Sequence, residues 1–338
     1  MKPLVSILIP AYNAENWIGY TLESAIGQTW PRKEIIVVND GSTDGTAEVA
    51  RRYASREVKV VTTENRGLSA AVNHAYRLSQ GDYIQELDSD DILALDKIKR
   101  QLEALQPGDT KRTLLSCPWG HFYYRTRRAQ VRRTSLWNDL TPVEWLLRKM
   151  GEKLHMQNAT WLVSRELAEA AGPWDEGLHY DQDGEYFCRV LMASEKTRFV
   201  AGTRIFYRVS GLNRISYIGS SDDKKRESLL RSIKLHIQYL RSLEASERVR
   251  KACLAYLQDH FSDFYPERPD LVAELQRLAA ELQGSLQEHR LRRKYAWMGP
   301  IFGWKVAKNA QLLLPEIKGM VFKYCDKAMF KLETAKRS

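Results

Sequence analysis

Three carboxylates crowd into four residues, Asp88-Ser89-Asp90-Asp91, where the apolar run 83–87 ends. Their mutual repulsion costs free energy, which a bound divalent cation would relieve. Mg²⁺ or Mn²⁺ held by one or two carboxylates usually fills its remaining positions with water and substrate phosphates. In an open α/β sheet such ligands bind at the carboxyl ends of the strands. Taken alone, the cluster fits a metal site and a solvated turn or helix cap equally well.

Two loops earlier in the chain also follow apolar runs. Residues 10–15 lead into a helical pattern, so their backbone N–H groups could meet a phosphate or a base. Tyr12 could stack on a nucleobase; alternatively, Asn13 is only a helix cap and Tyr12 a surface side chain. Asp40 ends the second apolar run, where it could accept a base N–H or belong to an ordinary turn and cap.

A third polar loop, residues 64–67, opens a segment of small side chains that would allow close packing or close approach of a ligand. No GxGxxG segment follows the first apolar run, so a dinucleotide cofactor is not indicated. No GxxxxGK(S/T) phosphate loop is present either.

The elements that would position these loops alternate regularly. Short apolar runs at 4–9, 34–38, 58–61 and 83–87 are separated by helical patterns at 14–28, 46–56 and 68–79. We expect Pro10 to end the first strand. Such alternation is typical of a parallel sheet covered by helices. The sequence therefore predicts an α/β fold with a doubly wound, mostly parallel sheet.

The pattern changes along the rest of the chain. Between residues 110 and 216 we expect strands at 114–117, 122–124 and within 198–208, and helices at 142–150 and 165–171. Beyond Gly219 helical patterns cover 222–243, 248–264 and 269–293, followed by a basic stretch from Pro300, punctuated at Pro315. We expect a catalytic domain over residues 1–218 and a helical, basic region over 219–338.

Composition bounds the class of protein. With 43% apolar and 28% charged residues among 338, the chain is globular rather than disordered. Its four cysteines and seven histidines show no paired or metal-ligand spacing, so we expect reduced, structural cysteines in a cytoplasmic protein. The first apolar run is too short for a secretory signal, and no run reaches the length of a membrane helix.

The net charge of +10 is concentrated at the C-terminal end. Residues 285–338 hold twelve Lys and Arg against four Asp and Glu, a net +8. A nucleic-acid site would have to lie in this tail, and we expect none. Because aromatic and aliphatic residues are interleaved with the cations, the tail predicts either a packed helical region with a solvated basic face or docking on an anionic membrane surface.

Four segments together are specific. VSILIPAYNAENWIGYTLESAIGQTW, EIIVVNDGSTDGT, NRGLSAAVNHAY and GDYIQELDSDD, in this order and spacing, closely resemble family 2 glycosyltransferases of the GT-A fold. The resemblance covers about the first hundred residues and is looser as far as Ser216. It implies binding of a nucleotide diphosphate sugar, by preference a UDP-sugar. The implied contacts fall on Pro10, Ala11, Tyr12, Asn13, Glu15, Asp40, Ser42, Asn65, Gly67, Ala70, Asp88 and Ser89.

The resemblance divides the acidic cluster by role. Asp90 corresponds to the metal ligand of the family's Asp-x-Asp motif, for Mg²⁺ or Mn²⁺, and Asp88 lies nearer the ribose. We expect Asp91 to cap a helix. One departure concerns the Arg that often precedes Asn in the family's NxGxxxARN segment, since Val72 stands at that position. Arg66 is a weakly supported substitute.

The acceptor side of the family carries a carboxylate followed by Arg, and here Asp183 matches it by its distance from Arg189. Inverting transfer needs one carboxylate to take the acceptor hydroxyl proton during attack on the anomeric carbon. Asp183 is the expected base, and Asp181 and Glu185 are its rivals. Arg208 could reach a phosphate or form a surface salt bridge.

The sequence thus predicts an inverting hexosyltransferase that uses a nucleotide sugar. No QxxRW segment is present, which favours a single addition to a glycan or lipid-linked acceptor in cell-surface glycan or glycolipid biosynthesis. A sugar nucleotidyltransferase is an alternative, but residues 10–13 lack its glycine-rich basic loop. A catalytically silent module that binds nucleotide sugar or membrane is another, which intact Asp90 and Asp183 disfavour.

Overall fold

The computed structural model describes residues 2–209, 222–287, 295 and 297–335. Its main sheet has the strand order β3-β2-β1-β4-β9. Four of these strands are parallel, namely β1 (Val5–Ala11), β2 (Lys33–Asp40), β3 (Val58–Thr63) and β4 (Tyr83–Glu86). The short edge strand β9 (Val163–Ser164) runs antiparallel to β4. The predicted parallel sheet is therefore confirmed.

Pro10 does not end the first strand as expected, because β1 continues through it to Ala11. The neighbouring strand β4 pairs only with Val5 to Leu8, whereas β2 pairs with β1 along its whole length. Beyond Leu8, one side of β1 has therefore lost its partner strand. Proline is tolerated where a strand needs no N–H donor on one side.

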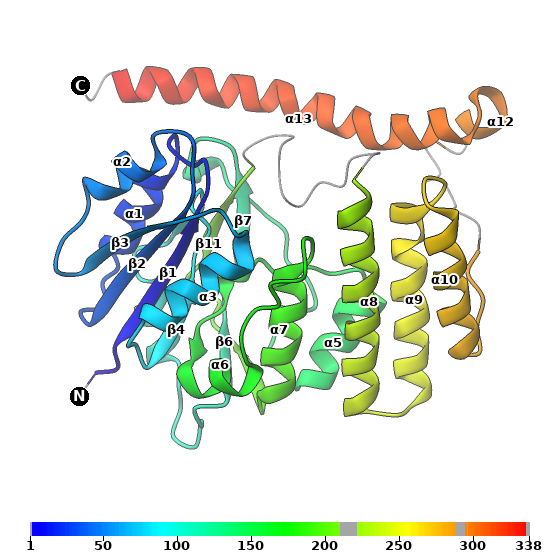
Figure 1. Cartoon of the computed structure of the whole chain (residues 1–338), viewed down its shortest axis with the longest axis horizontal. Helices are drawn as coiled ribbons and strands as arrows, with labels where there is room; N and C mark the ends of the chain where they lie inside the picture. The colour runs from blue at the N-terminus through cyan, green and yellow to red at the C-terminus, as the bar shows by residue number, and fades with distance from the viewer. Residues whose placement is uncertain (1, 210–221, 288–294, 296, 336–338) are drawn as a thin grey trace.

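Helices cover both faces of the sheet, as a doubly wound fold requires (Figure 1). On one face α1 (Ile18–Ile26) and α4 (Lys97–Glu103) pack against side chains such as Ile7 and Val37. On the other face α3 (Leu68–Leu78) packs against Leu8 and Ile36. The helix α2 (Thr46–Arg51) follows β2. Alternate residues of β1 thus belong to two different cores, since successive side chains of a strand point to opposite faces.

Two smaller sheets complete the α/β part. One pairs β6 (Thr113–Ser116) with β10 (Lys196–Phe199), and the other has the order β5-β11-β7-β8. The second is built from β5 (Ile92–Leu93), β7 (Trp119–Phe122), β8 (Gln130–Val131) and β11 (Ile205–Arg208). The strand expected at 122–124 is found earlier in the chain, since β7 begins at Trp119 and ends at Phe122.

The remaining helices lie beside the sheet or extend the molecule away from it (Figure 1). They are α5 (Pro142–Gly151), α6 (Arg165–Ala171), α7 (Gln182–Ala193), α8 (Asp223–Leu243), α9 (Glu247–Phe264) and α10 (Pro269–Glu281). One continuous hydrophobic core joins Leu8 and Ile36 of the sheet to Leu257 and Leu275 of α9 and α10. The expected domain boundary at 218/219 falls outside the described residues.

A long C-terminal helix lies along one edge of the molecule, at the top of Figure 1. It comprises the short α12 (Met298–Phe302) and then α13 (Trp304–Ala335), which continues through Pro315 where an interruption was expected. Across the described residues, no helix combines the length and the apolar character needed to cross a bilayer.

Candidate active site

The loops after β1 and β2 are bonded to each other. Asn13 has a φ of 49° and donates its backbone N–H to the Ser42 hydroxyl (3.0 Å), while its side-chain oxygen accepts the Thr43 N–H (2.9 Å). The Glu15 carboxylate accepts the Gly45 N–H (2.8 Å). Asn13 therefore joins two loops rather than capping its own helix, and Tyr12 beside it stays 52% exposed.

Asp40 orders the loop that precedes α3. Its two carboxylate oxygens accept the backbone N–H groups of Arg66 (2.9 Å) and Gly67 (2.8 Å). The loop passes so close to Gly41 that a Cβ there would lie 2.6 Å from the Asn65 nitrogen. Gly41 also has a φ of 65°, which favours glycine. Asp40 is buried, so its first task is to fix this loop beside the strand ends.

The acidic loop 88–91 is held by amides from a distant part of the chain. The Asn158 side chain donates to Asp88 (3.1 Å), and the Gln157 amide donates to Asp91 (2.7 Å) and lies 3.3 Å from Asp88. Both donors belong to the turn at 157–160, which leads into β9. These contacts neutralise part of the repulsion inside the loop.

Contacts between Asp91 and Arg208 fix the C-terminal end of this loop. Asp91 is fully buried and accepts the Arg208 backbone N–H (2.7 Å), so the expectation that it caps a helix is wrong. The Arg208 guanidinium donates to the Asp90 carbonyl (2.8 Å) and lies over the Trp17 ring (4.2 Å to its centroid). Arg208 is 2% exposed, which excludes a surface salt bridge, one of its two predicted roles; contact with a phosphate stays a prediction.

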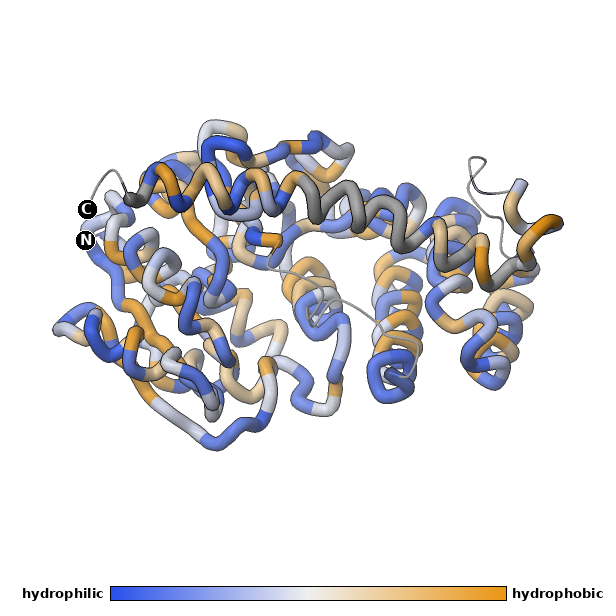
Figure 2. Tube along the Cα trace, turned by 90° about the horizontal axis from the view of Figure 1, so that it is seen from above, coloured by the Kyte–Doolittle hydropathy of each residue, from blue (hydrophilic) through white to orange (hydrophobic). Residues whose placement is uncertain are grey.

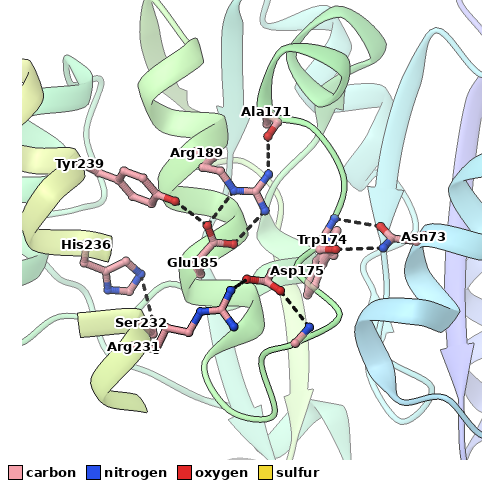
Figure 3. A network of polar contacts seen from close by, with 11 residues as sticks. Asn73, Ala171, Trp174, Asp175, Glu185, Arg189, Arg231, Ser232, His236 and Tyr239 are labelled. Carbon is pink, nitrogen blue, oxygen red and sulfur yellow. Dashed lines mark hydrogen bonds and ion pairs between the residues drawn. The ribbon is translucent and has the colours of Figure 1, made fainter. Parts of the chain in front are cut away.

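The expected base and its rivals lie around the first turns of α7. Asp181 precedes the helix in a left-handed conformation (φ 58°), and its carboxylate accepts the Ser232 hydroxyl of α8, beside the buried His236. Glu185 is buried in a two-point ion pair with Arg189 (2.7 and 2.8 Å) and accepts the Tyr239 hydroxyl (2.8 Å; Figure 3). Both rivals therefore point into the helical region.

Asp183 differs from both rivals. It occupies the first turn of α7 and is half-buried. Within the described part of the chain its carboxylate accepts no hydrogen bond from another residue. A carboxylate at a helix N-terminus interacts favourably with the helix dipole.

A tryptophan joins α7 to the end of β4. Trp174 donates its ring N–H to Glu86 (3.1 Å) and stacks on Tyr186 of α7 with ring centroids 4.7 Å apart. The Asn73 side chain of α3 pairs with the backbone of Trp174 in both directions (2.9 Å each; Figure 3). These contacts fix the loop before α7 against the same strand end that carries the acidic loop.

The pKa values reflect this crowding of acids. Burial, assisted by the Asp90 carboxylate, raises the pKa of Asp88 to about 7. Burial also raises the pKa of Glu86 well above its usual range, and the charges of Asp88 and Asp183 add to that rise. Asp183 thus acts electrostatically on Glu86 and on Asp88, which come from a different part of the sequence.

The residues present fit a substrate-completed metal site. No set of three or more His, Cys, Asp or Glu residues that could hold a metal ion occurs in the described ranges. Mg²⁺ and Mn²⁺ need only one or two carboxylates when phosphates and water complete the shell. Asp88 and Asp90 are both half-buried in the acidic loop, where their repulsion favours a cation.

Sequence reasoning missed several residues of the site. Gln157 and Asn158 lie in a segment without periodicity, so only their amide chemistry could have suggested donors to carboxylates. His155 was also missed; its ring is exposed and lies edge-on to Trp119, with ring centroids 5.6 Å apart. Val72, at the position of the family's Arg, is buried in the core. Arg66, the suggested substitute for that Arg, is paired with Glu176 (3.2 Å).

The other predicted contacts lie along the same edge. Pro10 and Ala11 end β1 and are buried, Asn65 is exposed beside Gly41, and Ala70 is buried in the first turn of α3. The carbonyls of Ser89 and Asp91 accept the Thr21 hydroxyl of α1 (3.0 and 2.9 Å). Residues 210–216, the last part of the segment covered by the resemblance, lie outside the described residues.

Sequence comparison points to one family. The family model described as Glycosyl transferase family 2 matches residues 6–170. An uncharacterized glycosyltransferase of Rickettsia typhi is 32% identical over 200 residues, 57% of this chain and 60% of the relative. The putative teichuronic acid biosynthesis glycosyltransferase TuaG of Bacillus subtilis is 42% identical over 105 residues, 30% of this chain and 42% of the relative. The chain thus spans about 60% of the length of the relatives from Rickettsia typhi and Rickettsia prowazekii.

Solved structures share the fold. S. aureus TarS 1-349 in complex with UDP-GlcNAc has a TM-score of 0.64 at 16% identity and covers 82% of this chain and 81% of its own. The mannosyltransferase PcManGT from Pyrobaculum calidifontis, in complex with GDP-Man and Mn²⁺, has a TM-score of 0.56 at 21% identity and covers 97% and 88%. These likenesses confirm the predicted GT-A type of α/β fold with a helical C-terminal region.

Proposed function

Residues 6–170 belong to glycosyltransferase family 2, and on that premise we propose that the chain transfers one sugar from a nucleotide diphosphate sugar to a hydroxyl group, with inversion at the anomeric carbon. The observation that carries the proposal is the Trp174 bridge. It holds the α7 turn bearing Asp183 against the strand end bearing Asp88 and Asp90. The proposed base on α7 and the proposed diphosphate site after β4 are thereby held next to each other.

The donor would lie across the loops after β1, β2 and β3. Tyr12 offers an exposed ring for stacking on the base, and the Asp40-ordered loop presents Asn65 beside it. Asp88 would accept a ribose hydroxyl. UDP is the preferred nucleotide, because TarS, which shares the fold, is described in complex with UDP-GlcNAc; GDP is the alternative, as in PcManGT.

Transfer is a single displacement. Asp183 takes the proton of the acceptor hydroxyl as its oxygen attacks the anomeric carbon from the side opposite the diphosphate. The bond from that carbon to the diphosphate oxygen breaks, and the oxygen keeps the electron pair. Asp183 accepts no hydrogen bond from another described residue, whereas Glu185 has both oxygens engaged with Arg189.

Asp90 would hold the divalent cation, with Asp88 as its neighbour. Mg²⁺ or Mn²⁺ bound there would offset the negative charge that develops on the departing diphosphate. Gln157 and Asn158 keep the acidic loop in place by donating to Asp88 and Asp91. Arg208 holds the backbone of the same loop.

The acceptor belongs, in this proposal, to a cell-surface glycan or glycolipid, and the protein works on the cytoplasmic side of the membrane. The relative TuaG, named for teichuronic acid biosynthesis, supports the first part. No part of the described chain contradicts a lipid-linked acceptor. The acceptor and the sugar are to be found by screening.

The test combines binding and turnover. Thermal-shift measurements with nucleoside diphosphates and Mn²⁺ should reveal one preferred nucleotide, and the Asp90→Ala variant should lose that metal-dependent shift. Hydrolysis or transfer of the preferred nucleotide sugar should fall about 10²–10⁴-fold in Asp183→Asn, the usual contribution of a general base. Full activity in a folded Asp183→Asn protein would show that another group is the base.

Glu185→Gln is the matched control for the base. It sits two residues further along α7 and breaks the buried pair with Arg189. We expect it to lower the free energy of unfolding by about 3 kcal/mol, as expected for a buried ion pair left without one partner. Turnover per folded molecule should change far less than in Asp183→Asn. The reverse ranking would make Glu185 the base.

A further inference from the structure

Exposed apolar side chains are concentrated at the C-terminal end of the described chain. Thirteen large hydrophobic side chains are exposed in the described residues, and eight of them lie between Trp297 and Leu332. The eight are Trp297, Ile301, Phe302, Val306, Phe322, Tyr324, Met329 and Leu332. Clustering of this kind marks an interaction surface, whereas single exposed hydrophobics are normal.

Four exposed side chains form one stripe on α13, which we call the outer stripe: Phe322, Cys325, Met329 and Leu332. Their spacing of three, four and three residues places them on a single face of a helix. Phe322 is 67% and Leu332 59% exposed, so this face packs against no other part of the described chain. At the other end of the helix, Ile301 and Phe302 of α12 are similarly exposed.

The inward face of α13 is chemically different. Asp326 accepts hydrogen bonds from the backbone N–H groups of Tyr124 (2.9 Å) and Arg125 (3.1 Å) and pairs with the Arg125 guanidinium (2.6 Å). Glu333 pairs with the same guanidinium (2.9 Å), and Phe330 packs against the Tyr124 ring. Both carboxylates are therefore paired with Arg125 inside the protein. The charges that remain on the outside of this part of the helix are positive.

A basic loop adjoins the outer stripe. We call residues 125–133 the arginine loop; it contacts α13 through Arg125 and also through Arg127, which pairs with Glu333. Its further arginines Arg128, Arg132 and Arg133 are exposed. Lys327 and Lys331 of α13 are exposed as well, so this side of the described chain combines apolar side chains with cations.

We propose that α12, α13 and the arginine loop form a docking surface for an anionic lipid bilayer. An interfacial helix needs apolar side chains that enter the acyl boundary and cations that meet anionic head groups, and this surface supplies both. Its extent fits a flat partner, because a helix of 32 residues is about 48 Å long. Figure 2 shows α13 crossing the outside of the molecule with hydrophobic residues at both described ends.

The docking surface is connected to the candidate active site by stacked side chains. Phe330 of α13 contacts Tyr124 (5.9 Å between ring centroids), and Tyr124 contacts Trp17 (5.5 Å). Trp17 lies beneath the Arg208 guanidinium, which donates to the Asp90 carbonyl. A docked molecule would therefore hold the acidic loop close to the lipid head groups. The proposal stands without the proposed function, since lipid binding requires no turnover.

The exposed thiol of Cys325 provides the readout. The other three cysteines are buried, so an environment-sensitive fluorophore will label the full-length chain at the outer stripe. Vesicles of phosphatidylcholine with about one third phosphatidylglycerol should shift its emission to the blue and sediment the unlabelled protein. Pure phosphatidylcholine vesicles should do neither, and raised salt should weaken the binding. Equal binding to both vesicles, or binding to neither, would overturn the proposal.

Matched variants separate the two contributions. Phe322→Ser, Met329→Ser and Leu332→Ser combined should weaken vesicle binding about tenfold or more, because each removes buried apolar area in the docked state. Leu95→Ser, at an equally exposed leucine outside this surface, should change nothing. Arg128→Ala with Arg132→Ala should weaken anionic binding about fivefold per cation removed. Binding of the preferred nucleotide should be unchanged in all of them.

A second copy of the chain is the competing occupant of the outer stripe. Light scattering of the wild-type protein without vesicles should show a monomer at micromolar concentration. A dimer that the triple serine variant converts to a monomer would assign the stripe to self-association and overturn the membrane proposal.

Discussion

The buried Lys97 side chain shows how the protein satisfies an ionisable group that is removed from water. Lys97 is fully buried, and its amine donates to the Gln85 side-chain oxygen and to the Trp161 carbonyl (3.1 Å). A neutral amine has two N–H donors, and both find acceptors here. Burial accordingly lowers the pKa of Lys97 to about 7. The residue serves the site indirectly, because Trp161 follows the turn that carries Gln157 and Asn158.

This burial predicts a pH-dependent stability. In the unfolded chain Lys97 keeps its proton up to about pH 10.4, whereas the folded protein releases it above about pH 7. Between these values the unfolded state binds more protons, so the free energy of unfolding rises with pH. We expect wild-type stability to increase from pH 7 to 9 relative to Lys97→Met, measured by urea unfolding. A pH-independent difference between the two proteins would mean that Lys97 stays charged when buried.

At the scale of elements, the central parallel strands and their helices follow from the sequence because both faces of β1 and β2 are buried. The run 35–38 is apolar at every position for that reason. The helix α7 was missed, since its buried face includes Gln182 and Glu185 and breaks the hydrophobic period. The sequence names Asp183 as the expected base by its distance from Arg189, and that assignment stays a prediction. The sequence could not show that Glu185 is buried in an ion pair with Arg189, because side chains two residues apart point to different sides of a helix and only packing shows which side is buried.

The first turn of α7 offers a test of this arrangement. Alanine normally favours a helix over glycine by about 1 kcal/mol. At Gly184, however, a Cβ would overlap the Asp181 carboxylate, which folds back over the turn to meet Ser232. We therefore expect Gly184→Ala to destabilise the protein by about 1–3 kcal/mol, as overpacking does, and to reduce transfer activity through displacement of Asp183.

Gly151→Ala is the control for that substitution. Gly151 ends α5, and a Cβ there would make only an ordinary contact with Ala252 at 3.9 Å. It should leave the melting temperature unchanged or raise it slightly. If Gly184→Ala behaves in the same way, the Asp181 carboxylate is not fixed over the helix turn.

At the scale of the whole molecule, the helical region shares its core with the α/β part. Side chains of α8, α9 and α10 belong to the same hydrophobic cluster as Leu8 of β1 and Val72 of α3. The sequence showed where helical periodicity begins but not which surface it covers, because periodicity identifies an apolar face and not its partner. The attachment of α13 differs in kind, since its described contacts are ionic with Arg125 of the arginine loop and aromatic with Tyr124.

Arg125 should therefore control the attachment of α13. Its side chain is 9% exposed and pairs with Asp326 and Glu333, so Arg125→Ala leaves both carboxylates without their main partner. Since one pair is buried and the other half-exposed, we expect a loss of about 2–3 kcal/mol, between the values for exposed and buried pairs. Hydrogen exchange should accelerate at least about tenfold in residues 322–333, while the strands β1 and β2 keep their protection. Arg112→Ala, which breaks an exposed pair with Glu166, should leave exchange in α13 unchanged. Undiminished protection of 322–333 in Arg125→Ala would mean that aromatic packing alone holds the helix.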